Sequence, residues 1–237
     1  MSENIRDTQI LFLDIETVTG ESTFDRLSER MQNLWKKKAA PLTRDAEEDP
    51  ETLYNRAAIY AEFGKIVCIS VGFLAKDRTL RLKSFCGKNE KKILTEFSLL
   101  LNTHYNDDQK YLCAHNGKEF DYPYIARRML INGIPLPRLL NISGKKPWEV
   151  RHLDTMEMWK FGDFKSYTSL ELLTEIFGIP SPKTDIDGSQ VSEIFWQQSD
   201  LKRITSYCEK DVTAVVQLYL SYRNKELIPE EKIICVE

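Results

Sequence analysis

Asp14 and Glu16 stand near the end of an otherwise apolar stretch, ILFLDIET, that covers residues 10–17. Apolar residues occupy both alternating faces of this stretch, which predicts a short buried strand. Because side chains alternate along a strand, both acids share a face with Ile10 and Phe12. Two unpaired carboxylates at the end of a buried strand are costly, and a hard divalent cation that prefers oxygen ligands would neutralise them. The pattern indicates either a metal site or a strand that ends early and leaves both acids in solvent.

Asp121 is a second candidate, because it begins a predicted helix just beyond the short predicted strand Tyr111–Ala114. Pro123 suits the first turn of that helix, and Gly133 suits its C-terminal cap. The turn that leaves a strand often carries the chemistry of a sheet protein. The alternative is an ordinary first-turn acid that only complements the helix N-terminus.

Asp211 lies on a long predicted helix that begins after a proposed cap at Ser199. The apolar stripe of this helix consists of Leu201, Ile204, Cys208, Val212, Val215 and Leu218. Asp211 falls at the shoulder of that stripe rather than on the polar face, and Tyr207 precedes it by one turn, so that both side chains project together. The pair indicates either a cation site with a phenol beside it or a buried Tyr–Asp hydrogen bond that serves structure alone.

Together these segments form an ordered triple. Asp14-Ile15-Glu16, the segment Asn116–Asp121 and Tyr207-x-x-x-Asp211 resemble the three motifs of DEDD-superfamily 3′–5′ exonucleases in their tyrosine variant. The run HNGKEFDYPYI at 115–125 is especially similar to the proofreading domain of family B DNA polymerases. Each motif alone is weak, whereas the three in this order, on strand, turn and helix, are specific.

The resemblance implies a metal-dependent 3′–5′ exonuclease that releases 5′-mononucleotides from the 3′ end of DNA, with single-stranded DNA favoured as substrate. It implies two Mg²⁺ or Mn²⁺ ions, about 3.5–4 Å apart, with these ligands: Asp14, Glu16, Asp121 and Asp211. Asp14 would bridge the ions, Glu16 and Asp211 would complete the first site, and Asp121 would support the second. Tyr207 would orient the attacking water.

Three further residues, Thr17, Asn116 and Phe120, are expected to contact the substrate. Asn116 would orient either the local backbone or the substrate, and Phe120 would either stack on a terminal base or pack in the core. Asp154 is either support for the site or a plain strand-end acid. Two alternative functions are a 3′–5′ exoribonuclease and an inactive nucleic-acid-binding module, although the presence of all four acids argues against the second.

The elements that must position these residues alternate in type. After the first strand comes a charged helical segment at about 21–60, and then a predicted hairpin of Lys65–Leu74 and Thr79–Phe85. The strand and helix around Asp121, a short strand near Arg151–Thr155 and the Asp211 helix follow. This order predicts an α/β fold with a mixed sheet covered by helices on both faces. The resemblance implies an RNase H-like sheet, here of five strands with the first three antiparallel.

We expect a single exonuclease domain over 1–237 with an insertion at about 21–60, because the chain of 237 residues has no low-complexity linker and no room for the other domains of a polymerase. The 33 Lys and Arg against 36 Asp and Glu give a net charge of −3, which argues against nonspecific coating of nucleic acid. The five cysteines lack CxxC spacing, and the chain shows neither a signal peptide nor a long apolar run, which predicts a cytoplasmic protein.

Overall fold

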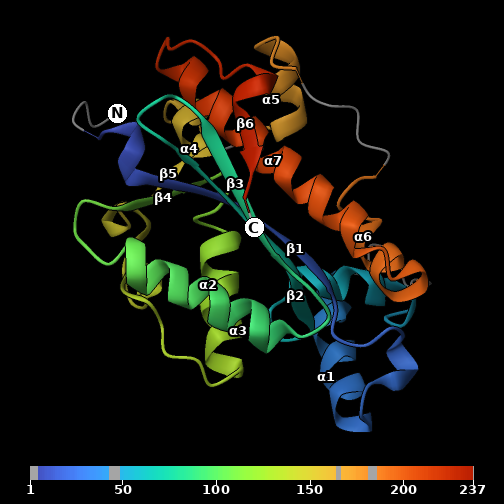
Figure 1. The fold of residues 1–237 in the computed structure, drawn as a ribbon. Helices are drawn as coiled ribbons and strands as arrows, with labels where there is room; N and C mark the ends of the chain where they lie inside the picture. The colour runs from blue at the N-terminus through green and yellow to red at the C-terminus, as the bar shows by residue number, and fades with distance from the viewer. Residues whose placement is uncertain (1–4, 43–48, 164–166, 181–185, 237) are drawn as a thin grey trace.

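A six-stranded sheet forms the centre of the computed structural model, which describes residues 5–42, 49–163, 167–180 and 186–236 (Figure 1). Its strands, in the order β5-β4-β1-β2-β3-β6, are β1 Ile10–Thr19, β2 Gly64–Leu74, β3 Leu80–Cys86, β4 Tyr111–Ala114, β5 Leu153–Asp154 and β6 Ile233–Cys235. The pairs β1–β2 and β2–β3 are antiparallel, whereas β4 is parallel to β1, β5 to β4 and β6 to β3. The predicted mixed sheet with three antiparallel first strands is confirmed.

The predicted number of strands, five, is wrong for the described residues. The sixth strand, β6, pairs with Leu80–Leu82 of β3, and the N–H of Val236 donates to the carbonyl of Leu82 at 2.7 Å. Three residues are too few to show a period of two. The unpaired edge of β3 decides their conformation, because it offers backbone groups that need partners.

Helices cover both faces of the sheet, as predicted (Figure 1). The α-helices of the described chain are α1 Glu29–Ala39, α2 Glu90–His104, α3 Asp121–Ile131, α4 Thr155–Lys160, α5 Leu170–Ile176, α6 Val191–Glu193, which continues as the π turn Ile194–Gln198, and α7 Leu201–Tyr222. Leu11, Leu13 and Ile15 of β1 face α2 and α3. Ile10 and Phe12 face α7. The alternation of β1 therefore decides which side chains meet which helix layer.

Close packing holds α7 against the sheet. At Gly72 of β2, a Cβ atom would lie 2.9 Å from Cγ1 of Val212, so that only glycine admits the helix at this distance. The cap of α7 is Asp200, whose carboxylate accepts from the N–H of Arg203 at 3.1 Å. Ser199, the predicted cap, instead adopts a left-handed conformation with φ of 55°. Both residues are good caps, and the choice between neighbours depends on backbone dihedrals.

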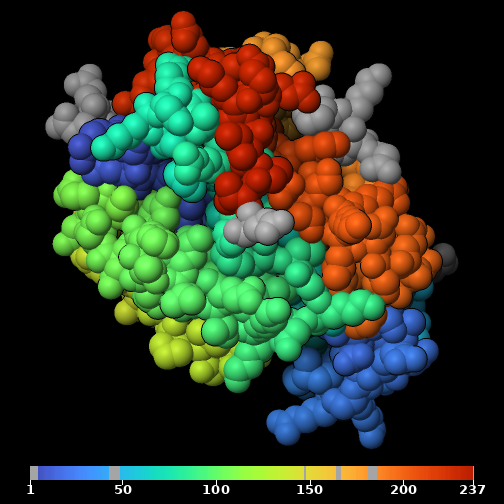
Figure 2. All heavy atoms as spheres, viewed as in Figure 1, coloured from blue at the N-terminus to red at the C-terminus, as the bar shows by residue number. Residues whose placement is uncertain are grey.

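The segment that we expected to be helical at about 21–60 contains α1 and a 3₁₀ helix, η4, at Thr52–Ile59. Its own small aromatic core consists of Phe24, Trp35, Ala39, Tyr54, Ala57 and Phe63. In the space-filling view the α1 part projects from the body of the molecule (Figure 2). Among the described residues, no helix combines the length and the apolar character that crossing a membrane requires.

Candidate active site

The even-numbered residues of β1 bring two acids beneath α7. Ile10 and Phe12 pack against that helix, and Asp14 and Glu16 continue the same row, as the period of two predicted. Glu16 is only 6% exposed. Directly after it the pairing with β2 slips, because Glu16 lies opposite Cys68 whereas the next residue lies opposite Ile66. Such a bulge bends a strand and redirects its side chains, and bulges are common beside active sites.

Helix α7 places the thiol of Cys208 in contact with Asp14. The Cys208 thiol donates to Oδ2 of Asp14 at 3.4 Å and to its backbone oxygen at the same distance. Asp211 lies one turn along, and its negative charge raises the pKa of both Asp14 and Glu16. The acid at the shoulder of the predicted stripe therefore reaches the two acids of β1.

The fourth acid arrives from the turn that joins β4 to α3. Asp121 begins α3, is 3% exposed, and raises the pKa of both β1 acids through its charge. Burial raises its own pKa, and hydrogen bonds from its backbone N–H and from that of Ile15, which separates Asp14 from Glu16 in β1, offset part of this rise. All four acids that the sequence singled out thus lie close enough for their charges to interact, and among the described residues the possible ligand atoms of Asp14, Glu16 and Cys208 lie within 4.8 Å of one another.

The four acids repel one another in a poorly solvated site. Burial raises the pKa of Asp121 to about 8 and that of Asp211 to about 6. Burial first, and then the neighbouring carboxylates, raises the pKa of Asp14 and of Glu16 well above the usual range. Within the described part of the chain, no lysine or arginine forms an ion pair with any of the four. Clustered buried oxygen ligands without a cationic partner fit hard divalent cations.

Tyr207 lies beside this cluster on α7. Burial, and then the charges of Asp211, Glu16 and Asp14, raises the pKa of the phenol, so that it stays a neutral hydrogen-bond donor. Burial raises the pKa of Asp211, and the hydrogen bond from the phenol offsets part of that rise. The predicted projection of Tyr207 and Asp211 to the same place is present in the structure.

The three predicted substrate contacts differ in their surroundings. Thr17 is partly buried and interacts with the phenol of Tyr124, and the ring of Phe120 packs 5.3 Å from that of Tyr124. Asn116 adopts a left-handed φ of 62°, and its buried Oδ1 finds no hydrogen-bond partner among the described residues. These three residues lie in the segments that carry the acids, and Asn116 retains an acceptor for a further contact.

Sequence reasoning missed two contributions. Cys208 was assigned only to the apolar stripe, yet it contacts Asp14. Asp154 was left undecided, yet its carboxylate accepts four backbone N–H groups, two of them in the turn before Asp121. Asp154 and Glu157 have the spacing of a helix-capping box. This signal predicts the cap of α4, but it does not predict the hydrogen bonds from Asn116 and Lys118.

Comparison with known families agrees with this geometry. Residues 59–230 match the family described as predicted 3′-5′ exonuclease related to the exonuclease domain of PolB. The chain belongs to this family. The match includes Asn116–Asp121 and Tyr207–Asp211 and begins after Asp14 and Glu16. The resemblance that the sequence motifs indicated is thereby confirmed.

The fold of this chain is similar to that of the family B DNA polymerase from the hyperthermophilic archaeon Pyrobaculum calidifontis. The two are 17% identical with a TM-score of 0.50, and the aligned part covers 94% of this chain but 26% of the polymerase. The chain thus spans about a quarter of the length of the polymerase it matches. At this identity the likeness concerns the fold, which is the predicted RNase H-like arrangement of a mixed sheet between helices.

Proposed function

We propose that this PolB-related exonuclease is a metal-dependent enzyme that hydrolyses single-stranded DNA from its 3′ end and releases 5′-mononucleotides. The observation that carries the proposal is the meeting of β1, α3 and α7, which contribute Asp14, Glu16, Asp121 and Asp211 to one cluster of interacting acids. Glu16 and Asp121 are buried, and Asp14 and Asp211 are partly buried. A purely structural role for this cluster would leave four mutually repelling acids, two of them buried and two partly buried, without a compensating positive charge. A catalytic role explains why the fold retains them.

These four acids would hold two divalent ions, Mg²⁺ or Mn²⁺. When bound, such ions lower the pKa of water and offset the charge that develops on the phosphate. Asp14 is the natural shared ligand, because the charges of the other three acids all act on it. Cys208 donates to Oδ2 of Asp14 and so orients that carboxylate within the cluster.

The protein's own groups would position the reactants. The neutral phenol of Tyr207 would donate a hydrogen bond to, and thereby orient, the attacking water. Thr17, Asn116 and Phe120 would contact the 3′-terminal nucleotide. Water attacks phosphorus, the bond to the 3′ oxygen breaks, and the shortened strand keeps a 3′ hydroxyl.

The test uses a single-stranded DNA oligomer labelled at its 5′ end, with the RNA of the same sequence in parallel. We expect a ladder of products shortened from the 3′ end with Mn²⁺ or Mg²⁺, and none with EDTA. Asp14→Ala and Asp211→Ala should abolish the ladder. Glu119→Gln, an exposed acid two residues before Asp121, is the matched control and should keep it.

A double variant of Asp14 and Asp211 that digests DNA as fast as the wild type would overturn the assignment. Faster digestion of RNA would make the chain an exoribonuclease instead, and a gel shift without cleavage would indicate a binding module. The closeness of the family to polymerase exonuclease domains supports DNA.

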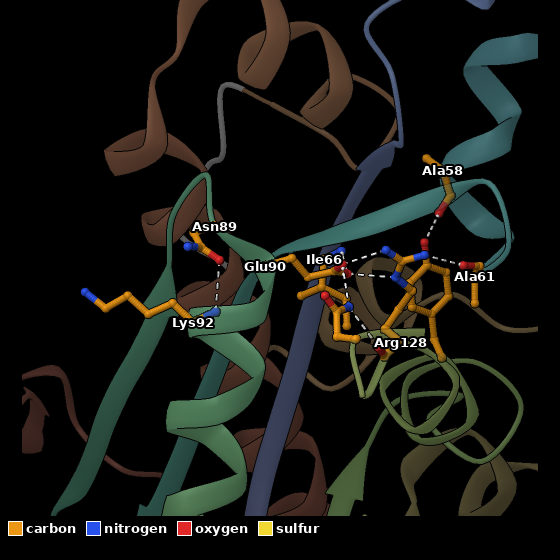
Figure 3. A network of polar contacts seen from close by, with 9 residues as sticks. Ala58, Ala61, Ile66, Asn89, Glu90, Lys92 and Arg128 are labelled. Carbon is orange, nitrogen blue, oxygen red and sulfur yellow. Dashed lines mark hydrogen bonds and ion pairs between the residues drawn. The ribbon is translucent and has the colours of Figure 1, made fainter. Parts of the chain in front are cut away.

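We also propose that the chain forms one exonuclease domain with an insertion at about 21–60. Its aromatic core is separate from those of the sheet, yet two hydrogen bonds tie the segment to α3. The phenol of Tyr124 donates to the carbonyl of Ala58 at 2.8 Å, and Arg128 donates to that of Ala61 at 2.7 Å (Figure 3). All five cysteines are free thiols, which suits the reducing cytoplasm that we propose as the location.

A further inference from the structure

Asp154 ends β5 and lies opposite Ala114, the last residue of β4. It is 2% exposed, and its two carboxylate oxygens accept four backbone N–H groups. Oδ1 accepts from Asn116 at 3.0 Å, Met156 at 3.0 Å and Glu157 at 3.3 Å, and Oδ2 accepts from Lys118 at 3.0 Å. Hydrogen bonds to an ionised carboxylate are about twice as strong as those between neutral groups, so these four bonds hold the side chain of Asp154 firmly to the backbone around it.

The four bonds serve two different segments. The bonds from Met156 and Glu157 cap the first turn of α4, as an aspartate at the N-cap position of a helix commonly does. Those from Asn116 and Lys118 reach across to the turn between β4 and α3. A simple helix cap would need only the first two bonds.

The turn that Asp154 holds is tightly constrained. Asn116 has a φ of 62°, and a Cβ at Gly117 would lie 2.5 Å from that of Ala114. The carbonyl of Asn116 accepts from the N–H of Phe120 at 3.0 Å, and that of Gly117 accepts from Tyr122 at 2.9 Å. The two residues on either side of Asp121 are thus fixed by the turn that Asp154 anchors.

We infer that Asp154 is a positioning residue that sets the place of Asp121 relative to Asp14 and Glu16. It acts on Asp121 through the backbone of residues 116–120, and its negative charge also acts on the Asp121 carboxyl. It touches neither substrate nor reacting atoms, and of the readouts below the amide exchange reports the backbone effect separately. The inference rests on the proposed function, because it gives Asp121 a part in metal binding. It also explains why a buried acid follows so short a strand.

The test compares Asp154→Asn with Asp154→Ser. Asparagine replaces one acceptor oxygen with an amide NH2 group, which cannot accept a hydrogen bond from the backbone N–H groups that it would face. Serine retains a good cap for α4, but its single oxygen cannot serve both segments. For both variants we expect kcat to fall about 10- to 100-fold with an unchanged KM for DNA, the loss typical of groups that support metal ligands.

Two readouts do not depend on turnover. Mn²⁺ alone, titrated by electron paramagnetic resonance, should bind more weakly to both variants, and the backbone amides of residues 116–120 should exchange faster with solvent. Asp77→Asn is the control, since Asp77 also accepts a backbone N–H through its carboxylate, from Thr79 at 3.0 Å, in the turn between β2 and β3. It should keep the wild-type kcat and Mn²⁺ affinity.

Wild-type kcat and Mn²⁺ affinity in Asp154→Ser would overturn the inference and leave Asp154 as a cap. A failure of Asp154→Ser to fold would also overturn it, in favour of a purely structural role. Should the wild type cleave neither DNA nor RNA, the proposed function fails, whereas the Mn²⁺ titration and the amide exchange still decide the role of Asp154.

Discussion

The thiol of Cys208 donates a hydrogen bond to Oδ2 of Asp14 across 3.4 Å, and so joins the buried stripe of α7 to the acid of β1. This bond lowers the pKa of Asp14 while burial and three neighbouring acids raise it. A residue that packs in the core therefore also stabilises the charged form of a proposed metal ligand.

Cys208→Ala should weaken both the fold and the activity. Truncation of a fully buried side chain and loss of its hydrogen bond should lower the free energy of unfolding by about 1–2 kcal/mol. Because Asp14 loses its donor, kcat should fall several-fold. Urea unfolding and steady-state turnover measure the two effects, and full kcat in this variant would make the contact incidental to activity.

Asp14→Asn should abolish nuclease activity and yet stabilise the metal-free protein. It removes one of four poorly solvated acids that repel one another, so we expect the free energy of unfolding to rise by about 1–2 kcal/mol. Thermal unfolding in EDTA measures the change. Asp25→Asn, which removes an exposed acid, is the control for net charge and should have little effect.

Added Mn²⁺ should make the wild type more stable than Asp14→Asn, the reverse of the order expected in EDTA. At a concentration of 100 times Kd, an ion that binds only the folded state stabilises it by about 2.7 kcal/mol. The wild type should gain this stability and Asp14→Asn should not. Equal shifts in the two proteins would show that Mn²⁺ binds elsewhere.

The metal-free protein should lose stability as the pH rises. The folded pKa of Asp211 is about 6 and that of Asp121 about 8, whereas unfolded aspartate titrates near about 3.9. Between these values the folded chain binds more protons than the unfolded chain, so stability is highest below about pH 4 for these groups and falls until about pH 8.

Each group contributes a slope of at most about 1.4 kcal/mol per pH unit. Urea unfolding in EDTA from pH 5 to pH 8 measures the sum. Asp121→Asn should flatten the upper part of the curve, between about pH 6 and pH 8, because it removes a carboxyl with a pKa of about 8 whose charge also raises the pKa of Asp14 and Glu16. A slope that this substitution leaves unchanged would contradict the raised pKa of Asp121.

The sequence predicted the parts of the site that follow from local periodicity. The alternation of β1 placed Asp14 and Glu16 under one helix layer, and the helical period placed Tyr207 and Asp211 on one side of α7. The motif order then indicated the family, which the match confirms. These features depend on spacing, which a sequence shows directly.

The remainder depends on contacts between distant segments. Strand β6 forms because β3 has a free edge, and the bonds of Asp154 to Asn116 and Lys118 span 38 and 36 residues. The contact of Cys208 with Asp14 spans 194 residues. No local pattern encodes such distances, so an acid before a helix indicates a cap and nothing further.

Tyr207→Phe should slow the reaction without stopping it. The phenol keeps its ring but loses the hydroxyl that we propose to orient the attacking water. The loss of one positioning hydrogen bond, worth about 1–3 kcal/mol, corresponds to a fall in kcat of about 5- to 150-fold. Single-turnover kinetics with saturating Mn²⁺ measure it, and an unaltered rate would remove Tyr207 from the mechanism.

A buried ion pair joins α2, α3 and β2 away from the acids (Figure 3). Glu90 accepts from Arg128 at 2.6 and 2.8 Å, from Ile66 at 2.7 Å and from Asn132 at 3.0 Å. Every acceptor direction of this carboxylate is therefore occupied, which is the condition under which a buried pair is tolerated.

Arg128→Met should therefore destabilise the protein by about 3–5 kcal/mol, because it leaves the Glu90 carboxylate buried without its counter-charge. Lys92→Met is the control, since Lys92 pairs with Glu96 at 3.8 Å on an exposed helix face and its loss should cost no more than about 0.5 kcal/mol. Adding Glu90→Gln to Arg128→Met should recover part of the loss, because the neutral amide needs no cation. Urea unfolding compares the two variants. If the double variant has a lower free energy of unfolding than Arg128→Met, the unpaired charge of Glu90 is not the source of the destabilisation.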